Sequence, residues 1–227
     1  MKFLQITTIL VATLIAFSCN SQKSISLSEV EVEKPVGKPS KSEGGVVEFD
    51  VNGLKVILKQ AKNEVVSTKL FIKGGTANYE QDKAGIESLA LNLAAEAGTK
   101  HMTKEEYHTL LEQYGTTIGA NLNYDFTELT LRCVKQNWDK SWQLYTKVIK
   151  DPLFNVADFE IEKEKLINAA KQESSDPDAH LRNMGMAFAF PTGPYSKSYV
   201  GTEESISALT LEEAVSYTHL RAHETHN

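Results

Sequence analysis

Apolar and polar residues alternate in three short stretches after residue 45, and this period of two predicts β-strands. The first two stretches, Val47–Val51 and Leu54–Leu58, flank Asn52-Gly53, a dipeptide typical of two-residue hairpin turns. The third stretch, Val65–Ile72, ends at Gly74-Gly75. We therefore expect a β-hairpin and then a third strand at the start of the folded part of the chain.

A helical period replaces the alternation over residues 82–97, where apolar residues and alanines gather on one side. A second helix is expected to begin at Thr103, because Glu106 lies three residues further on and completes the pattern of a capping box. This helix should end near Tyr114-Gly115.

The second half of the chain contains two more predicted strands, Thr116–Leu122 and Phe126–Val134, joined by the polar turn Asn123–Asp125. Helical periods follow, with a break at Asp151-Pro152, over about residues 136–150, 156–172 and 176–188. Strands and helices in one compact unit predict an α+β fold, in which helices pack on one face of a mainly antiparallel sheet.

The N-terminus has the features of a bacterial lipoprotein signal. An apolar run over residues 6–17 is too short to span a bilayer comfortably, and Ala16-Phe17-Ser18-Cys19 resembles a lipobox. We expect residues 1–18 to be a signal peptide and Cys19 to be lipidated, which would anchor the protein in the cell envelope, facing the periplasm or the exterior. Plain secretion with an incidental cysteine is the alternative. Residues 19–45, rich in Ser, Lys, Glu, Pro and Gly, are expected to be a flexible tether before a domain at 46–214.

Composition excludes several classes of protein. The chain has 24 lysines and arginines against 30 acidic residues, a net charge of −6, so it lacks the basic surface expected of a nucleic-acid-binding protein. Its two cysteines cannot form a disulfide framework. If Cys19 is lipidated, Cys133 has no intrachain partner.

Six short segments, in a consistent order and spacing, carry a resemblance to a known family. They are Asn52–Leu58, Phe71–Ala77, Gly85-Ile86, Tyr114–Thr127, Asp151–Phe154 and Phe190–Ile206. Together they resemble the first half-domain of the pitrilysin/insulinase metallopeptidases. Members of that family usually have two such α+β half-domains in tandem, and these enclose the peptide substrate in a chamber. One half-domain cannot build that chamber alone.

The resemblance also indicates which residues to compare with the catalytic ones. Active members carry His-x-x-Glu-His on the first long helix, where two histidines bind zinc and the glutamate acts as general base. The equivalent positions here are Ser88, Leu91 and Asn92, and the third ligand, a glutamate on a later helix, corresponds to Ala169. A supporting acidic residue of the family is retained as Glu162.

This loss does not depend on the register of the alignment, because residues 81–100 contain no histidine. Neutral Ser and Asn side chains bind zinc poorly compared with imidazole and carboxylate, and Leu91 cannot accept a proton. The resemblance therefore implies a chain without a zinc cofactor and without the proteolytic activity of its relatives.

The function we expect is that of a non-catalytic homologue that binds peptide substrate or completes the chamber of an active, zinc-bearing paralogue. An extended peptide could pair with the edge of the strand Thr116–Leu122 by β-augmentation, and the resemblance directs attention to four residues of this region: Thr116, Gly119, Asn121 and Asn123. Two alternatives remain open: an active zinc metalloendopeptidase with a displaced site, and a binding or scaffold lipoprotein with no peptidase partner.

The end of the chain departs from this pattern. The family resemblance stops near residue 214, and residues 215–227 look like translated sequencing-adaptor sequence. We expect this tail to be non-native, and we expect no metal site in it despite its histidines.

Overall fold

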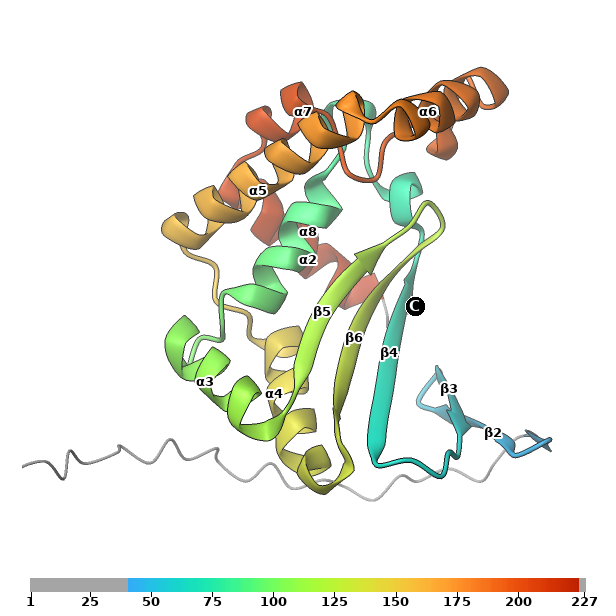
Figure 1. The fold of residues 1–227 in the computed structure, drawn as a ribbon, viewed down its shortest axis with the longest axis vertical. Helices are drawn as coiled ribbons and strands as arrows, with labels where there is room; N and C mark the ends of the chain where they lie inside the picture. The colour runs from blue at the N-terminus through green and yellow to red at the C-terminus, as the bar shows by residue number, and fades with distance from the viewer. Residues whose placement is uncertain (1–40, 225–227) are drawn as a thin grey trace, which may run out of the picture.

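The computed structural model describes residues 41–224, which form two small antiparallel sheets and a set of helices (Figure 1). The expected signal peptide, Cys19 and most of the expected tether lie outside the described residues. Within the described part, no helix is both long and apolar enough to cross a membrane.

The first sheet contains β1 (Lys41–Glu43), β2 (Val46–Val51) and β3 (Leu54–Lys59), in that spatial order. The hairpin prediction is confirmed: Val51 pairs with Leu54, and both turn residues have positive φ, 54° at Asn52 and 84° at Gly53. The strand β1 precedes residue 46, the expected start of the domain. A turn at Gly44-Gly45, with φ of 59° and 78°, returns the chain so that β1 pairs with β2.

The second sheet contains β4 (Val65–Lys73), β5 (Thr117–Leu122) and β6 (Phe126–Val134), in the order β4-β6-β5. All of its pairings are antiparallel, with Leu129 of β6 opposite both Leu70 and Ala120. The strands thus divide into two sheets rather than one. Every residue of β3 is exposed, so the hairpin has no buried face that would fix it on the second sheet.

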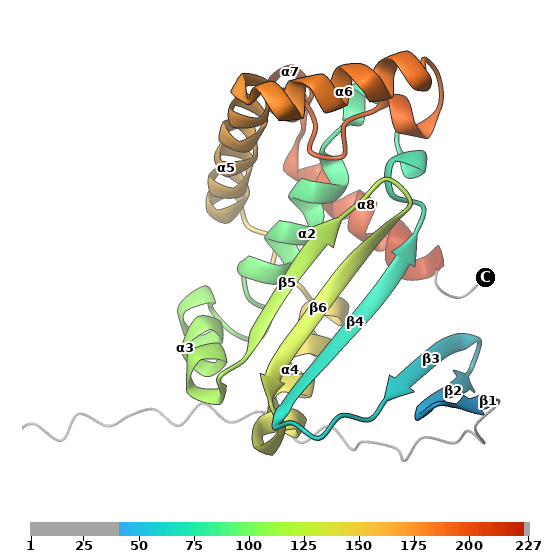
Figure 2. The ribbon, with the colours of Figure 1, turned by 45° about the vertical axis from the view of Figure 1, so that its right-hand side comes forward.

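Among the described residues, helices cover only one face of the second sheet. Alternate residues of β6 are buried, and they pack with α3 (Lys104–Tyr114) and α4 (Trp138–Lys150). Figures 1 and 2 show α4 behind the sheet, while no described helix crosses the face toward the viewer. The α+β prediction is confirmed. The buried residues of this core include Tyr107, Leu110, Ile118, Leu129, Leu131, Leu144, Tyr145 and Val148.

A second core lies between helices. It is formed by α2 (Ile86–Glu96), α5 (Val156–Ser175), α7 (Glu203–Ala208) and α8 (Leu211–Glu224). Its buried residues include Leu89, Leu93, Phe159, Leu166, Ile206, Leu209 and Tyr217. The remaining long helix, α6 (Pro177–Ala189), extends away from these cores and exposes Leu181, Met184 and Phe188 (Figure 1).

Local signals define several helix ends. Thr103 caps α3: its hydroxyl accepts a hydrogen bond from the Glu106 amide at 3.2 Å, and the Glu106 carboxylate accepts one from the Thr103 amide at 3.0 Å. The capping box is therefore confirmed. The helix α2, by contrast, begins at Ile86, because Gly85 is left-handed with φ of 93° and a 3₁₀ turn, η2 (Gln81–Lys83), precedes it. Three further 3₁₀ turns are η1 (Gly75–Asn78), η3 (Lys135–Asn137) and η4 (Pro194–Ser196).

The helix α8 continues past residue 214, where the family resemblance ends. Tyr217 is buried and its ring packs edge-on against that of Tyr79, with centroids 6.5 Å apart. This part of the expected non-native tail therefore has a place in the helical core. Whether residues 215–227 are native stays a prediction, and residues 225–227 lie outside the described chain.

Candidate functional site

The three residues that the resemblance aligns with the catalytic motif lie on α2, which runs beside β5 in both views and packs against α5 through the helical core. Ser88, in the first histidine position, is buried, and its hydroxyl donates a hydrogen bond to the Tyr199 carbonyl at 3.3 Å. Ser88 therefore ties the motif helix to the loop that precedes α7. Asn92, one turn later on the helix, is partly buried.

The residue in the position of the general base belongs to the hydrophobic core. Leu91 is buried and packs in the cluster that contains Met102 and Tyr107. An aliphatic side chain in this place can stabilise the packing of α2, but it has no atom that could accept a proton from water.

The two positions on α5 lie seven residues apart, close to two helical turns, and so share one side of the helix. Glu162 is buried, and its Oε1 accepts a hydrogen bond from the Lys165 ammonium at 2.6 Å. Ala169, in the position of the third zinc ligand, is exposed and offers no donor atom.

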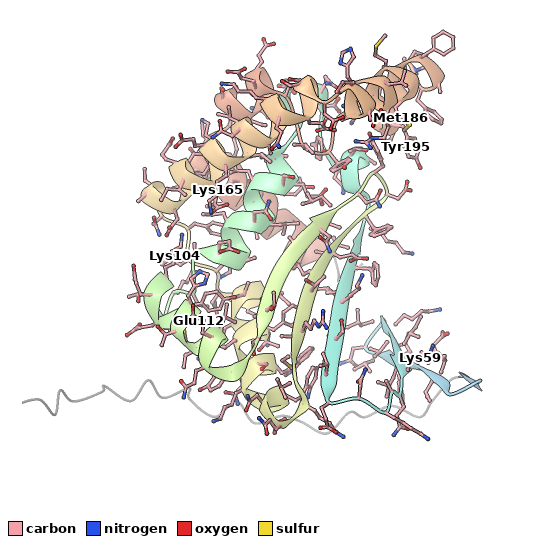
Figure 3. The ribbon with its side chains drawn as sticks, in the orientation of Figure 1. Lys59, Lys104, Glu112, Lys165, Met186 and Tyr195 are labelled. Carbon is pink, nitrogen blue, oxygen red and sulfur yellow. The ribbon has the colours of Figure 1, made fainter. Side chains whose placement is uncertain are left out.

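Two lysines, both labelled in Figure 3, pair with acidic residues of α5: Lys165 with Glu162, and Lys104 with Asp158. The hydrogen bond to Glu162 raises the pKa of Lys165 against the opposing effect of burial, and the charges of Glu162, Glu96 and Asp158 add to the rise. Burial acts to raise the pKa of Asp158, but hydrogen bonds from Lys104, at 2.7 Å, and from Asn155 outweigh it, so that the pKa is lowered. Asp158 is thus held as a carboxylate by the Lys104 ammonium and the Asn155 amide.

These residues do not fit a zinc ion of the family type. A hydroxyl that already donates to a backbone carbonyl, an aliphatic group, an amide and a methyl group replace two imidazoles and two carboxylates. Within residues 41–224, no three His, Cys, Asp or Glu side chains gather closely enough to hold a metal ion.

The loop between α6 and α7 docks closely on the start of α2. A Cβ at Gly85 would lie 2.8 Å from the Val200 carbonyl oxygen, and a Cβ at Gly201 would lie 2.6 Å from the Ala84 carbonyl oxygen. The Ser205 hydroxyl donates to that Ala84 carbonyl at 2.8 Å. Two glycines thus permit a backbone approach that keeps the loop against the motif helix, a contact that sequence patterns did not indicate.

An aromatic cluster joins this loop to the turn between β5 and β6. The Tyr124 ring packs against Tyr199 and Tyr195, with centroids 5.2 and 5.6 Å away, and Tyr195 packs against Phe190 at 5.1 Å. The Tyr195 hydroxyl donates to the Asp125 carboxylate at 2.5 Å, which raises the pKa of Tyr195. The turn is therefore fixed from the loop side.

Beside this cluster, between the end of α5, α6 and the loop, is an open cleft of about 360 Å³ with mixed polar and aromatic walls. Its charged side chains include two that form an ion pair, Lys171 and Glu203, at 2.8 Å. Further lining residues are Tyr124, Glu173, His180, Asn183, Met186 and Tyr195, of which Met186 and Tyr195 are labelled in Figure 3.

The four residues expected to bind substrate differ in accessibility. Thr116 is buried, just before β5, and its hydroxyl lies 2.7 Å from the Ser141 hydroxyl. Gly119 is partly buried and Asn121 exposed on the uncovered face of β5, and Asn123 is exposed in the following turn. Among the described strands, none pairs with the outer edge of β5, beside which α2 runs, so this edge of the second sheet is the place where strand pairing would occur.

Comparison with known proteins places this fold in a family. The sequence model of the insulinase family, peptidase family M16, matches residues 55–203. Two curated proteins of Helicobacter pylori (strain ATCC 700392 / 26695) are similar over 167 residues each: the non-peptidase homolog YmxG, 23% identical over 72% of this chain, and the zinc protease PqqE, 22% identical over 71%. The matched regions are 38% and 37% of those proteins, so this chain spans well under half of their length.

A solved structure shares the fold. The peptidase M16 inactive domain from Pseudomonas fluorescens superposes with a TM-score of 0.68 at 18% identity, over 76% of this chain and 42% of that one.

Proposed function

This chain belongs to the insulinase family, peptidase family M16, and on that premise we propose that it is a non-catalytic member that binds peptide for an active, zinc-bearing relative. The observation that carries the proposal is that the four positions that the resemblance aligns with the catalytic residues hold no zinc ligand or general base, in a chain that has the family's fold. Ser88 is hydrogen bonded to a backbone carbonyl, Leu91 belongs to the core, and Asn92 and Ala169 replace ligands.

The relatives support this interpretation. One curated relative is named a non-peptidase homolog and another, from the same organism, a zinc protease, and the similar structure is named an inactive domain. A family in which both kinds of protein occur is consistent with a pair of chains, of which one carries the metal and the other supports substrate binding.

Peptide binding would use the edge of β5. A peptide that adds a strand there would extend the order β4-β6-β5 and gain hydrogen bonds from backbone groups, which require no particular side chain. Gly119, Asn121 and Asn123 would lie along this peptide, whereas the buried Thr116 would only position the start of the strand. The loop held by Ser88 and the Tyr124 cluster would form the neighbouring wall.

The protein would carry out this function in the cell envelope. Lipidation of Cys19 would attach the chain to a membrane, and the Ser-, Lys- and Pro-rich residues that follow would separate the domain from the lipid. Mass spectrometry of the membrane fraction tests this step: a diacylated or triacylated Cys19 supports it, and a free N-terminus after another residue contradicts it.

Partner capture and zinc content test the role directly. The full native protein, isolated from its own cells with a C-terminal tag, should co-purify with a chain that carries His-x-x-Glu-His and should itself contain no stoichiometric zinc after dialysis. Recombinant protein alone should not cleave an unstructured peptide, with or without added zinc. Chelator-sensitive cleavage by the protein alone would instead indicate an active peptidase, and recovery without any such partner would indicate a binding or scaffold lipoprotein.

Strand pairing has its own test, because only alternate backbone amides of a β-strand face the neighbouring strand. Two peptides of the same sequence, one N-methylated at its odd-numbered residues and the other at its even-numbered residues, should therefore differ. The peptide whose methyl groups face β5 should lose binding, and the other phase of methylation should keep it. Equal losses in both phases, or none in either, would refute pairing at the β5 edge.

A further inference from the structure

The uncovered face of the second sheet carries a row of three polar side chains across all its strands. Arg132 of β6 lies opposite Ser67 of β4 on one side and opposite Thr117 of β5 on the other. All three residues are exposed. The arginine therefore stands in the middle of the sheet, between two hydroxyl-bearing residues, on the side that no described helix covers.

Arg132 differs from the other charged groups near it. Further along the same sheet, Lys69 of β4 and Glu128 of β6 form an ion pair at 2.8 Å. Arg132 has no acidic partner among the residues that the structure describes. Its guanidinium thus retains five donors for a ligand, in the planar arrangement that matches a carboxylate.

Small side chains separate Arg132 from the edge at which a peptide would pair. On the uncovered face, β5 presents Thr117 and then Gly119, which has no side chain. A peptide strand at the outer edge of β5 would lie about 10 Å from β6, two strand spacings away. Because the side chains of β5 are small here, the guanidinium of Arg132 on β6 and an acidic side chain of the peptide can reach each other across β5. The Thr117 hydroxyl can donate a hydrogen bond to the same carboxylate.

We infer that Arg132, with Thr117, binds a side-chain carboxylate of an extended peptide paired with β5, so that the site selects peptides with an aspartate or glutamate at one position. This inference rests on the proposed strand pairing and adds the chemical class of the peptide. It concerns an acidic side chain and not the terminal carboxylate, and the test below distinguishes the two.

The test uses peptides with acetylated and amidated ends, in which a single glutamate is moved along an otherwise neutral sequence and compared with glutamine at each position. Glutamate should bind about twofold to fivefold more tightly at one position, as expected for an exposed ion pair, and high salt should reduce the difference. Arg132→Gln should abolish the preference, so that the glutamate and glutamine peptides bind this variant with equal affinity. Arg182→Gln, which removes an equal charge on α6, should keep the preference.

The outcomes separate this inference from the proposal beneath it. Binding that follows the phase of N-methylation but shows no glutamate preference, or a preference that survives Arg132→Gln, would overturn the role of Arg132 and leave strand pairing intact. Peptides that fail to bind at all, or whose binding ignores the phase of N-methylation, would overturn strand pairing itself and this inference with it. Preference for a free C-terminal carboxylate over glutamate would overturn the assignment to a side chain.

Discussion

The close approach of the loop to α2 leads to a quantitative prediction for Gly85→Ala. Gly85 has φ of 93°, and an added Cβ would lie 2.8 Å from the Val200 carbonyl oxygen and 3.0 Å from Ile206 Cγ1. The first of these atoms belongs to the backbone, so it can move away only if the loop moves with it. The substitution should therefore both strain the residue and displace the loop from the motif helix.

The expected loss has two parts. A non-glycine residue in a left-handed conformation costs about 1–2 kcal/mol. Forcing an extra carbon into a packed contact typically costs another 1–3 kcal/mol or so. Gly85→Ala should therefore lower the free energy of unfolding by about 2–5 kcal/mol, a large share of the stability of a typical domain.

Gly115→Ala is the matched control. Gly115 also has positive φ, 57°, at the end of α3, but its added Cβ would meet only a methyl group of Val134, at the ordinary contact distance of 3.4 Å. This variant should lose only the conformational part, about 1–2 kcal/mol.

Urea unfolding followed by circular dichroism gives both values, provided that the slope of the transition is unchanged. Hydrogen exchange gives a second measurement, since Gly85→Ala should expose the amides of residues 199–201 more than Gly115→Ala does. Equal losses for the two variants, with unchanged exchange in the loop, would refute the claim that the loop and α2 are in tight backbone contact.

Three further predictions concern polar contacts. Thr103→Ala should cost about 1 kcal/mol of unfolding free energy by removing the capping box, while Thr103→Ser should retain most of it, as measured by urea unfolding. The pKa of Asp158 is lowered in the folded state, so its ion pair with Lys104 stabilises the fold above the ordinary value of 3.8 and loses this effect as the pH falls through the lowered pKa. In the Lys104→Met variant, the free energy of unfolding should depend less on pH in that range, as measured by acid unfolding. A curve that is the same as that of the unmodified protein would contradict the assignment of this effect to the ion pair. Thr116→Val should cost only about 1 kcal/mol, because Ser141 keeps its bond to a backbone carbonyl, whereas Ser141→Ala leaves the buried Thr116 hydroxyl unpaired and should cost more in the same assay.

The residues of the candidate site could be located in the sequence, but their contacts could not be predicted from it. The positions of Ser88, Leu91 and Asn92 on one helix follow from the helical period of residues 82–97, and the loss of imidazole and carboxylate at these positions is implied by the family resemblance. The sequence did not show that Lys165 is the residue that forms an ion pair with Glu162. Lys165 is only three residues away, yet a run of alternating charges on a helix does not show which pair faces inward. The roles of Tyr199 and Val200, more than a hundred residues from the motif, carried no local signal at all.

Structural features that depend on a few neighbouring residues could be predicted from the amino-acid sequence alone. The Asn52-Gly53 turn, the capping box at Thr103 and the strand Phe126–Val134 follow from backbone preference, short hydrogen bonds and a period of two, and the structure has all of them. Three features became visible only in the folded structure: the hairpin forms a separate sheet, Thr116 is buried, and the loop before α7 lies on α2. These features arise from contacts between segments far apart in the chain, where the available volume and the hydrogen-bond partners are fixed by other residues than those that carry the pattern.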